Sequence, residues 1–342
     1  MGEPARTGDV LSRREPRGRA LDEDDVRVRP GRGSRPRTRT RPRHEDAEGG
    51  FVRAVDRGRY TCLVGDREVT AMKARELGRH SVVVGDVVAL VGDVSGQADT
   101  LARIVRVEPR RSVLRRTADD TDPVERVVVA NADQLVIVTA LADPPPRLGF
   151  LDRCLVAAYD AGMDPLLCLT KADLTGPEEL LATYSDLGVP WVTTRPDTEP
   201  DALRERLAAR ESVLVGQSGV GKSTLVNRLI PGAERAIGAV NVVTGKGRHT
   251  STSAVALPLP GGDGWIVDTP GIRSFGLAHV KPDGLLAAFP DLAPGAEACP
   301  SGCGHTADDP GCGLDAWVAD GHALPARLAS YRRLLASRAT ID

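Results

Sequence analysis

A glycine-rich loop of the form G-x-x-x-x-G-K-S spans residues 216–223 and has the composition of a phosphate-binding loop. The strand-like residues 212–215 precede it, and apolar residues at helical spacing follow over 223–230. In such a loop the glycines let main-chain N–H groups face a phosphate, and the helix N-terminus adds partial positive charge. The expected nucleotide contacts are Gly216, Gln217, Ser218, Gly219, Val220, Gly221, Lys222, Ser223 and Thr224.

Two side chains of this loop have the chemistry of phosphoryl transfer. The ammonium group of Lys222 is expected to reach the β- and γ-phosphates, and the hydroxyl of Ser223 is expected to bind Mg²⁺. The simpler interpretation is a glycine-rich turn with a surface lysine, but the strand, loop and helix follow one another in the required order.

A candidate base-reading segment lies upstream of this loop, at Thr170-Lys171-Ala172-Asp173. It ends the apolar run 165–169, and ligands of open α/β sheets bind at the carboxyl ends of the strands. The Asp173 carboxylate can accept two N–H donors from guanine, while the stem of Lys171 lies along the base. Charged residues also end strands by chance, so the string alone is weak. The end of a second strand, at 190–194, is a further candidate support for the base.

A second triphosphate-sensing segment is the strand 265–268 followed by Asp-Thr-Pro-Gly at 268–271. We expect Asp268 to hold Mg²⁺ through water and the Gly271 N–H to meet the γ-phosphate. The polar stretch 232–253 is expected to be a mobile loop, in which Thr250 completes the Mg²⁺ shell. A Thr/Ser run of this kind also pairs along edge strands.

The residue after Asp-Thr-Pro-Gly is Ile272, where many GTPases carry a water-orienting glutamine. An apolar side chain cannot align a water molecule, so another group is required. His249, beside Thr250, is the candidate. The alternative is that His249 is a bystander or an RNA contact.

The order of these loops is reversed, because the base-reading loop precedes the phosphate loop in the chain. This order predicts a circularly permuted GTPase domain of α/β class. After residues 268–271 the chain runs through Phe275 toward the C-terminal segment, so the permutation connects the γ-phosphate sensor directly to that segment.

A cluster of cysteines near the C-terminus has metal-ligand spacing, C-x₃-C-x-H-x₆-C, at Cys299, Cys303, His305 and Cys312. Three thiolates and one imidazole suit a closed tetrahedral zinc site with a structural role. With no secretion signal, a disulfide is the less favoured alternative. The remaining three of the six cysteines lie in apolar patterns and are expected to be core thiols, namely Cys62, Cys154 and Cys168.

The first 47 residues have the composition of a disordered tail. Residues 26–43 hold eight arginines and no acid, although the net charge of the chain is −2. Such a tail suits RNA phosphates, and a merely solubilising tail is the alternative.

Short strands at close spacing then predict a small β-barrel of the OB type, a fold that often binds RNA. A purely structural barrel is the alternative. The predicted strands are 51–55, 60–64, 81–84, 87–91 and 102–107.

Together these features resemble the RsgA (YjeQ) family of circularly permuted GTPases. The resemblance runs from about residue 50 to the end and includes the strings at 85–88, 130–133, 216–223, 247–252 and 268–271. It implies a cytoplasmic factor that binds the immature small ribosomal subunit and its rRNA and is released after subunit-stimulated GTP hydrolysis.

The resemblance further implies GTP or GDP, Mg²⁺ and one Zn²⁺ as cofactors, other assembly factors as partners, a monomer, no membrane contact, and His249 in place of the missing glutamine. Two departures are Thr170, where the family carries Asn, and a Cys299–Cys303 spacing that is one residue short.

The domain boundaries that we predict are 1–47 for the tail, 48–116 for the RNA-binding barrel, 117–277 for the GTPase and 278–342 for the zinc-binding domain. In the last of these, Leu324, Leu328, Tyr331 and Leu335 are expected on one helical face that packs back onto the protein. The alternatives in function are a P-loop ATPase or kinase, and a slow RNA-binding scaffold that nucleotide only shapes.

Overall fold

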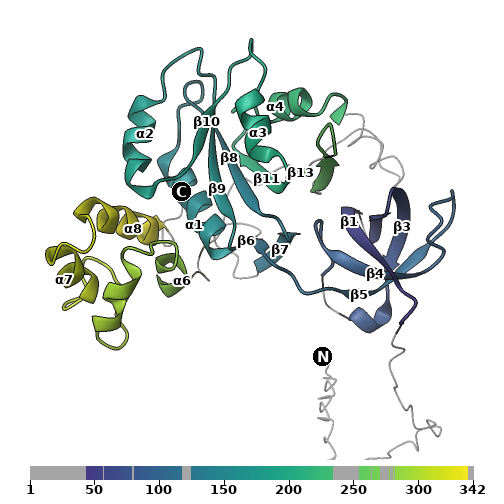
Figure 1. The fold of residues 1–342 in the computed structure, drawn as a ribbon, viewed down its shortest axis with the longest axis horizontal. Helices are drawn as coiled ribbons and strands as arrows, with labels where there is room; N and C mark the ends of the chain where they lie inside the picture. Colours follow the sequence, from purple (N-terminus) through teal and green to yellow (C-terminus); the bar gives the residue numbers. More distant parts are fainter. Residues whose placement is uncertain are drawn as a thin grey trace, which may run out of the picture. The chain divides into compact units, whose positions relative to one another are not determined.

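The computed structural model describes residues 44–56, 58–78, 81–117, 125–233, 254–262, 264–269, 277, 280 and 282–337. These residues form a barrel, a domain built on a mostly parallel sheet, and a helical C-terminal module (Figure 1). Within these ranges, we find no helix with the length and apolar character to cross a membrane.

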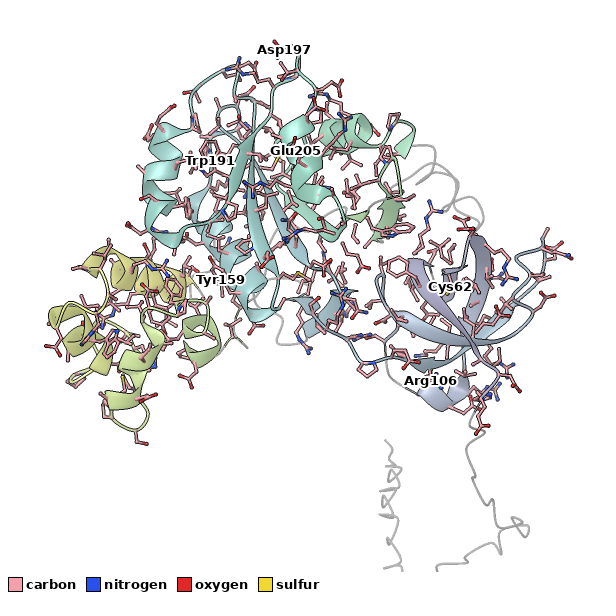
Figure 2. All side chains as sticks on the ribbon, in the orientation of Figure 1. Cys62, Arg106, Tyr159, Trp191, Asp197 and Glu205 are labelled. Carbon is pink, nitrogen blue, oxygen red and sulfur yellow. The ribbon has the colours of Figure 1, made fainter. Side chains whose placement is uncertain are left out.

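The barrel closes because β1 pairs with both β2 and β4, while β5 joins β3 to β4. Alternate residues point inward, and Cys62 on β2 lies inside the barrel (Figure 2). The prediction of an OB-type barrel is therefore confirmed. Its elements are β1 (Glu48–Asp56), β2 (Arg59–Val64), β3 (Arg67–Lys73), the 3₁₀ turn η2 (Arg75–Leu77), β4 (Val87–Gly92) and β5 (Ala102–Val107).

The predicted strand at 81–84 is wrong. The carboxylate of Asp86 accepts the main-chain N–H of Val83 at 2.8 Å and turns the chain, so that only an isolated bridge between Val84 and Val129 forms. Conversely, the prediction omitted β3, whose apolar alternation is confined to Val69 and Ala71 between charged ends.

Beyond the barrel, a hairpin of β6 (Val113–Thr117) and β7 (Glu125–Ala130) leads into the central sheet. The strand order there is β10-β9-β8-β11-β13-β12, and only β12 runs antiparallel. The predicted strands of this sheet are confirmed. Its strands are β8 (Gln134–Ala140), β9 (Asp164–Thr170), β10 (Trp191–Thr193), β11 (Arg210–Gly216), β12 (Val255–Pro258) and β13 (Gly264–Asp268).

Helices cover both faces of this sheet. Alternate residues along β8, β9 and β11 divide between two apolar cores, one shared with α1 and α2 and the other with α3 and α4 (Figure 1). The central strands β8, β9 and β11 are thus buried on both faces, which explains their apolar runs, whereas Trp191 on the edge strand β10 is exposed. These elements are α1 (Leu148–Asp160), α2 (Glu178–Tyr184), the 3₁₀ turn η3 (Ser185–Leu187), α3 (Asp201–Leu207) and α4 (Lys222–Leu229).

The C-terminal module comprises α6 (Pro282–Leu286), the 3₁₀ helix η4 (Ala293–Ala298), α7 (Gly313–Ala319) and α8 (Pro325–Ser337). α8 packs on α1, as predicted, and the Phe289 ring lies between Tyr331 of α8, at 5.4 Å, and Tyr159 of α1, at 6.4 Å. The predicted apolar face of α8 includes Leu328, Tyr331 and Leu335, which are buried.

Leu324 was wrongly assigned to that face. It precedes the first residue of α8 and is 66% exposed. Two arginines of α8 form ion pairs beside this face. Arg333 lies 3.3 Å from the carboxylate of Asp152 on α1, and Arg327 forms a bidentate pair with Asp291, which lies before η4 in the same module, at 2.8 and 2.9 Å.

Candidate functional site

The predicted phosphate loop connects β11 to α4 with the backbone shape that such a loop needs. Gly219 and Gly221 have φ of +84° and +90°, a region that L side chains rarely adopt. At Gly216 a Cβ atom would lie 2.7 Å from the main-chain oxygen of Val138, so the strand can turn into the loop only with glycine. These glycines therefore leave main-chain N–H groups free to face a bound anion.

Lys222 and Asp268 form an ion pair at the centre of this site. Lys222 begins α4 and Asp268 ends β13, the strand beside β11 in the sheet. Each side chain is only 13% exposed, which strengthens the attraction between the charges. The hydroxyl of Thr269 donates to the carbonyl of Leu214 at 2.8 Å and fixes the chain just after Asp268.

The exposed side chains of Ser223 and Thr224 lie in the first turn of α4. Ser223 is the residue after Lys222, which pairs with Asp268. A cation held between Ser223 and Asp268 would therefore compete with the Lys222 ammonium group for the Asp268 carboxylate.

The base-reading segment lies directly against the phosphate loop. The hydroxyl of Thr170, at the end of β9, donates to the carbonyl of Val220 at 2.6 Å and lies 3.3 Å from that of Thr139. Both contacts are buried, so this hydroxyl holds the phosphate loop from the position where the resemblance implies an asparagine. The departure at Thr170 thus leaves the connection between the loops intact.

The following residues leave the sheet in a sharp turn. Lys171 has φ of +57°, and its ammonium group donates to the carbonyl of Asp143, a contact that the sequence analysis did not anticipate. The N–H of Ala172 donates to Thr194, which follows β10, at 3.2 Å. Asp173 is exposed at the mouth of this turn. The described structure therefore brings together the phosphate loop, Asp268 and the base-reading loop.

Several predicted residues lie outside the described residues: His249, Thr250, Gly271 and Ile272, as well as the arginine tail and most of the loop 232–253.

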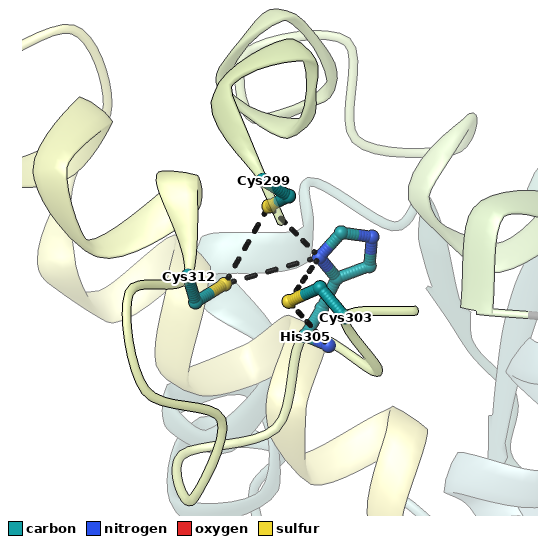
Figure 3. A group of neighbouring side chains, drawn as sticks. All are labelled: Cys299, Cys303, His305 and Cys312. Carbon is teal, nitrogen blue, oxygen red and sulfur yellow. Dashed lines mark hydrogen bonds between the residues drawn. The ribbon is translucent and has the colours of Figure 1, made fainter. Parts of the chain in front are cut away.

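The four predicted zinc ligands converge in the C-terminal module (Figure 3). Nδ1 of His305 lies 3.4, 3.6 and 3.8 Å from the sulfurs of Cys299, Cys303 and Cys312, and the sulfurs of Cys299 and Cys312 are 4.0 Å apart. Tetrahedral zinc with ordinary bond lengths separates two sulfurs by about 3.8 Å and sulfur from nitrogen by about 3.6 Å. The donor set and its spacing therefore fit one zinc ion, despite the short Cys299–Cys303 spacing.

Groups around the cluster orient these ligands. Nε2 of His305 faces the carboxylate of Asp283 at 3.5 Å, leaving Nδ1 for a metal. The N–H of Gly313 donates to the Cys299 sulfur at 3.1 Å, and Arg332 donates to the carbonyl of His305 at 3.2 Å. Sequence reasoning missed Asp283, because no spacing rule connects a ligand to a carboxylate on a separate helix.

The other cysteines are confirmed as core thiols. Cys62, Cys154 and Cys168 are fully buried, and burial raises the pKa of both Cys62 and Cys168 to about 12. These thiols consequently stay protonated and chemically inert.

The sheet order, with the phosphate-loop strand at its centre and the base-reading strand earlier in the chain, defines a circularly permuted P-loop GTPase fold. The comparisons agree with this class. The family model "RsgA GTPase" matches residues 107–278.

The small ribosomal subunit biogenesis GTPase RsgA of Pseudomonas aeruginosa (strain UCBPP-PA14) is 44% identical over 248 residues, which cover 70% of this chain and 72% of that protein. The protein of the same name from Gemmatimonas aurantiaca is 39% identical over 280 residues, 79% of this chain and 90% of that one.

Two solved structures share the fold. YjeQ from Thermotoga maritima has a TM-score of 0.63 at 26% identity and covers 86% of this chain and 99% of its own. YloQ, described as a circularly permuted GTPase, has a TM-score of 0.60 at 22% identity, covering 87% and 96%, and supports the fold alone.

The chain therefore belongs to the RsgA family of GTPases. Hydrolysis of a guanine nucleotide is its reaction, and a P-loop ATPase or kinase is not favoured.

Proposed function

We propose that this GTPase acts in the late maturation of the small ribosomal subunit. It binds the subunit and its rRNA, hydrolyses GTP to GDP and phosphate when the subunit stimulates it, and is then released. Its relatives are named small ribosomal subunit biogenesis GTPases, which supports this role. We further propose that it works as a monomer in the cytoplasm together with other assembly factors.

Two contacts carry the catalytic part of the proposal: the Lys222–Asp268 ion pair, and the Thr170–Val220 hydrogen bond that joins the base-reading loop to the phosphate loop. We assign base recognition to Asp173, with Thr170 and Lys171 holding its loop. Lys222 stabilises the charge on the phosphates, and the phosphates take the place of Asp268 beside the ammonium group. Asp268 would then be available to hold Mg²⁺ through water.

The remaining assignments complete this site. Ser223 and Thr250 are proposed as Mg²⁺ ligands, the Gly271 N–H as a contact of the γ-phosphate, and His249 as the group that orients the attacking water. These four residues are additions to the Lys222–Asp268 pair, which is the part of the site that rests on an observed contact.

The flanking regions are proposed to bind RNA and to hold the zinc. The barrel over 48–116 and the arginine tail over 1–47 would contact rRNA, the GTPase domain would span 117–277, and the module over 278–342 would hold one structural zinc ion. Zinc binding is supported by the convergence of its three cysteines and one histidine.

A GTPase assay with and without purified small subunits tests the proposal. We expect the subunits to raise the turnover of the wild-type protein, and Lys222→Ala to lose hydrolysis under both conditions. A rate that subunits leave unchanged would contradict the ribosomal role while sparing GTP hydrolysis.

Co-sedimentation with small subunits tests the release step. The protein should sediment with the subunits in a non-hydrolysable GTP analogue and remain in the supernatant in GDP. Equal sedimentation in the two nucleotides would show that hydrolysis does not control release.

A further inference from the structure

Two sequence strings that nucleotide chemistry leaves unexplained meet in the structure. Gly-Asp-Val-Val begins at Gly85 in the barrel, and Ala-Asn-Ala-Asp ends the hairpin strand β7 and leads into the GTPase domain. The side-chain amide of Asn131 donates to the carbonyl of Gly85 at 2.8 Å, and its oxygen accepts the N–H of Arg111 at 2.8 Å. Asn131 is 4% exposed and has φ of +61°, so the residue is held in a conformation that few side chains adopt.

The two main chains are in direct contact at this point. Gly85 has φ of +89°, and a Cβ atom on it would lie 2.0 Å from the carbonyl oxygen of Ala130. The N–H of Ala130 donates to the carbonyl of Val84 at 3.0 Å. Main-chain atoms of Ala130 fill the space beside Gly85, and main-chain atoms cannot change rotamer as a side chain can. The two segments therefore cannot shift relative to each other without breaking this contact.

Two consecutive arginines of the same segment have different partners. Arg110 forms a bidentate ion pair with Asp86 of the barrel, at 2.7 and 2.8 Å, and the Asp86 carboxylate is fully buried. Arg111 donates to Asp133 at 2.6 Å and to the carbonyl of Asn131 at 2.7 Å. The Arg110–Asp86 pair is the firmer of the two, because removing Arg110 would leave the buried Asp86 carboxylate without its counter-charge, whereas Arg111 is 62% exposed.

Asp133 connects this contact to the strands that carry the nucleotide loops. Its carboxylate accepts the N–H of Glu211 at 2.9 Å, its own N–H donates to the carbonyl of Glu211 at 2.8 Å, and its carbonyl accepts the N–H of Asp164 at 2.9 Å. Glu211 lies on β11, which ends in the phosphate loop, and Asp164 begins β9, which ends in the base-reading loop. Each strand has seven residues, of which the last five are buried, so the loops lie about 20 Å from the contact with Asp133.

We propose that these residues form a coupling joint that transmits the position of the barrel to both nucleotide loops. The coupling joint consists of Gly85, Asp86, Arg110, Arg111, Asn131 and Asp133. The proposal rests on the proposed function, since it requires the barrel to be engaged by the small subunit when hydrolysis is stimulated. The residues of the joint act as positioning residues, because they bring no group to the nucleotide.

The decisive variant is Asn131→Gly, which removes both side-chain bonds but keeps a residue that tolerates positive φ. We expect its basal kcat and its KM for GTP to match the wild type, while the stimulation by small subunits falls about tenfold, a typical size for coupling between sites. The matched control is Ala209→Gly, at an exposed position with φ of +57° outside the joint, which should keep full stimulation. Full stimulation of Asn131→Gly would overturn the proposal.

A second variant guards against a general loss of folding. Arg111 is 62% exposed, so Arg111→Met keeps the surface position while removing the contact with Asp133. It should show the same selective loss of stimulation at an unchanged thermal midpoint. A loss of basal and stimulated activity in equal proportion, in both variants, would assign the residues to folding instead of coupling.

Hydrogen exchange separates a failure of the joint from a failure of the proposed function. If the wild type itself is not stimulated by small subunits, the proposed function fails, and the joint is judged by exchange alone. Asn131→Gly should then raise the exchange of the barrel turn 83–86 and of the Glu211 amide together, relative to the Ala209→Gly control. Faster exchange in the barrel turn alone, with the Glu211 amide unchanged, would show that the barrel is not coupled to β11 and would overturn the proposal.

Discussion

The hydroxyl of Thr170 donates a hydrogen bond of 2.6 Å to the main-chain carbonyl of Val220. This bond connects the base-reading loop to the middle of the phosphate loop, although the two lie 50 residues apart and in reversed order. Because both groups are buried, the bond holds the two halves of the nucleotide site in a fixed relation. The circular permutation has therefore moved the chain connection without separating the two loops.

Replacing Thr170 with valine should weaken nucleotide binding. The side chains have the same shape, but valine leaves the buried carbonyl of Val220 without its donor, at a cost of about 1–3 kcal/mol. We expect this cost to destabilise the nucleotide-bound protein. The dissociation constants for GTP and GDP, measured by isothermal titration calorimetry, should then rise by roughly 5- to 150-fold.

The matched control is Thr170→Ser, which keeps the hydroxyl and should bind as the wild type does. Equal affinity of the valine and serine variants would show that the Thr170–Val220 bond does not organise the site.

Asp173 should determine the choice of base. Its exposed carboxylate lies at the mouth of the loop held by Thr170, where it can accept the two N–H donors of guanine. Asp173→Asn presents a donor in place of an acceptor, so we expect the preference for GTP to move toward xanthosine triphosphate.

Competition binding of the two nucleotides measures this exchange of preference. Asp99→Asn, which changes an exposed acid of the barrel, serves as the control and should keep the preference for GTP. An Asp173→Asn variant that still selects GTP by the same margin would refute the assignment.

The sequence was sufficient wherever chemistry depends on residues close together in the chain. The phosphate loop and the zinc ligands were predicted because their spacing is local, and the structure brings each group together. Asp283 beside His305, and Asn131 against Gly85, could not be predicted, because each contact joins residues whose separation follows no periodic rule. The prediction of a strand at 81–84 was wrong because the Asp86 carboxylate accepts the main-chain N–H of Val83, which a strand would use for pairing in the sheet.

Losing a zinc ligand should unfold the C-terminal module selectively. Cys312→Ser removes one of three thiolates from a site whose apparent binding energy is about 10–16 kcal/mol in small zinc modules. We expect zinc content to fall from about one ion per chain toward none, together with faster hydrogen exchange in α7 and α8.

Cys62→Ser is the control for the loss of a buried thiol. Cys62 lies in the barrel interior, so its replacement should leave the zinc content unchanged. Retention of a full equivalent of zinc by Cys312→Ser would show that the four-residue cluster is not the metal site.

Stability in acid should depend on the Arg327–Asp291 pair. Hydrogen bonds from Arg327 hold the pKa of Asp291 below its ordinary value of 3.8. An acid with a lowered pKa in the folded state contributes stability that is present above pH 3.8 and is lost as the pH falls through the folded pKa. The difference in thermal midpoint between the wild type and Arg327→Met should therefore be full at neutral pH and shrink below about pH 4.

Part of that difference will persist in acid, because Arg327 also lies 4.7 Å from the Phe289 ring centre and this contact does not titrate with Asp291. Arg59→Met, at an exposed barrel position, is the control and should show no such dependence. A difference between wild type and Arg327→Met that stays constant from pH 7 to pH 3 would mean that the ion pair adds nothing to stability.

His249 should matter for the chemical step and little for binding. The chain has Ile272 where many GTPases carry the glutamine that orients water, and we propose the imidazole of His249, beside Thr250 in the sequence, in its place. We expect His249→Ala to lower the subunit-stimulated kcat by about 10²- to 10⁴-fold, the usual contribution of such a group, at an unchanged dissociation constant for GTP. His249→Gln should recover part of the rate, because its amide can also align a water molecule. If instead turnover persists in His249→Ala while binding to small subunits fails, the histidine is an RNA contact, and water must be oriented by a group that the subunit brings.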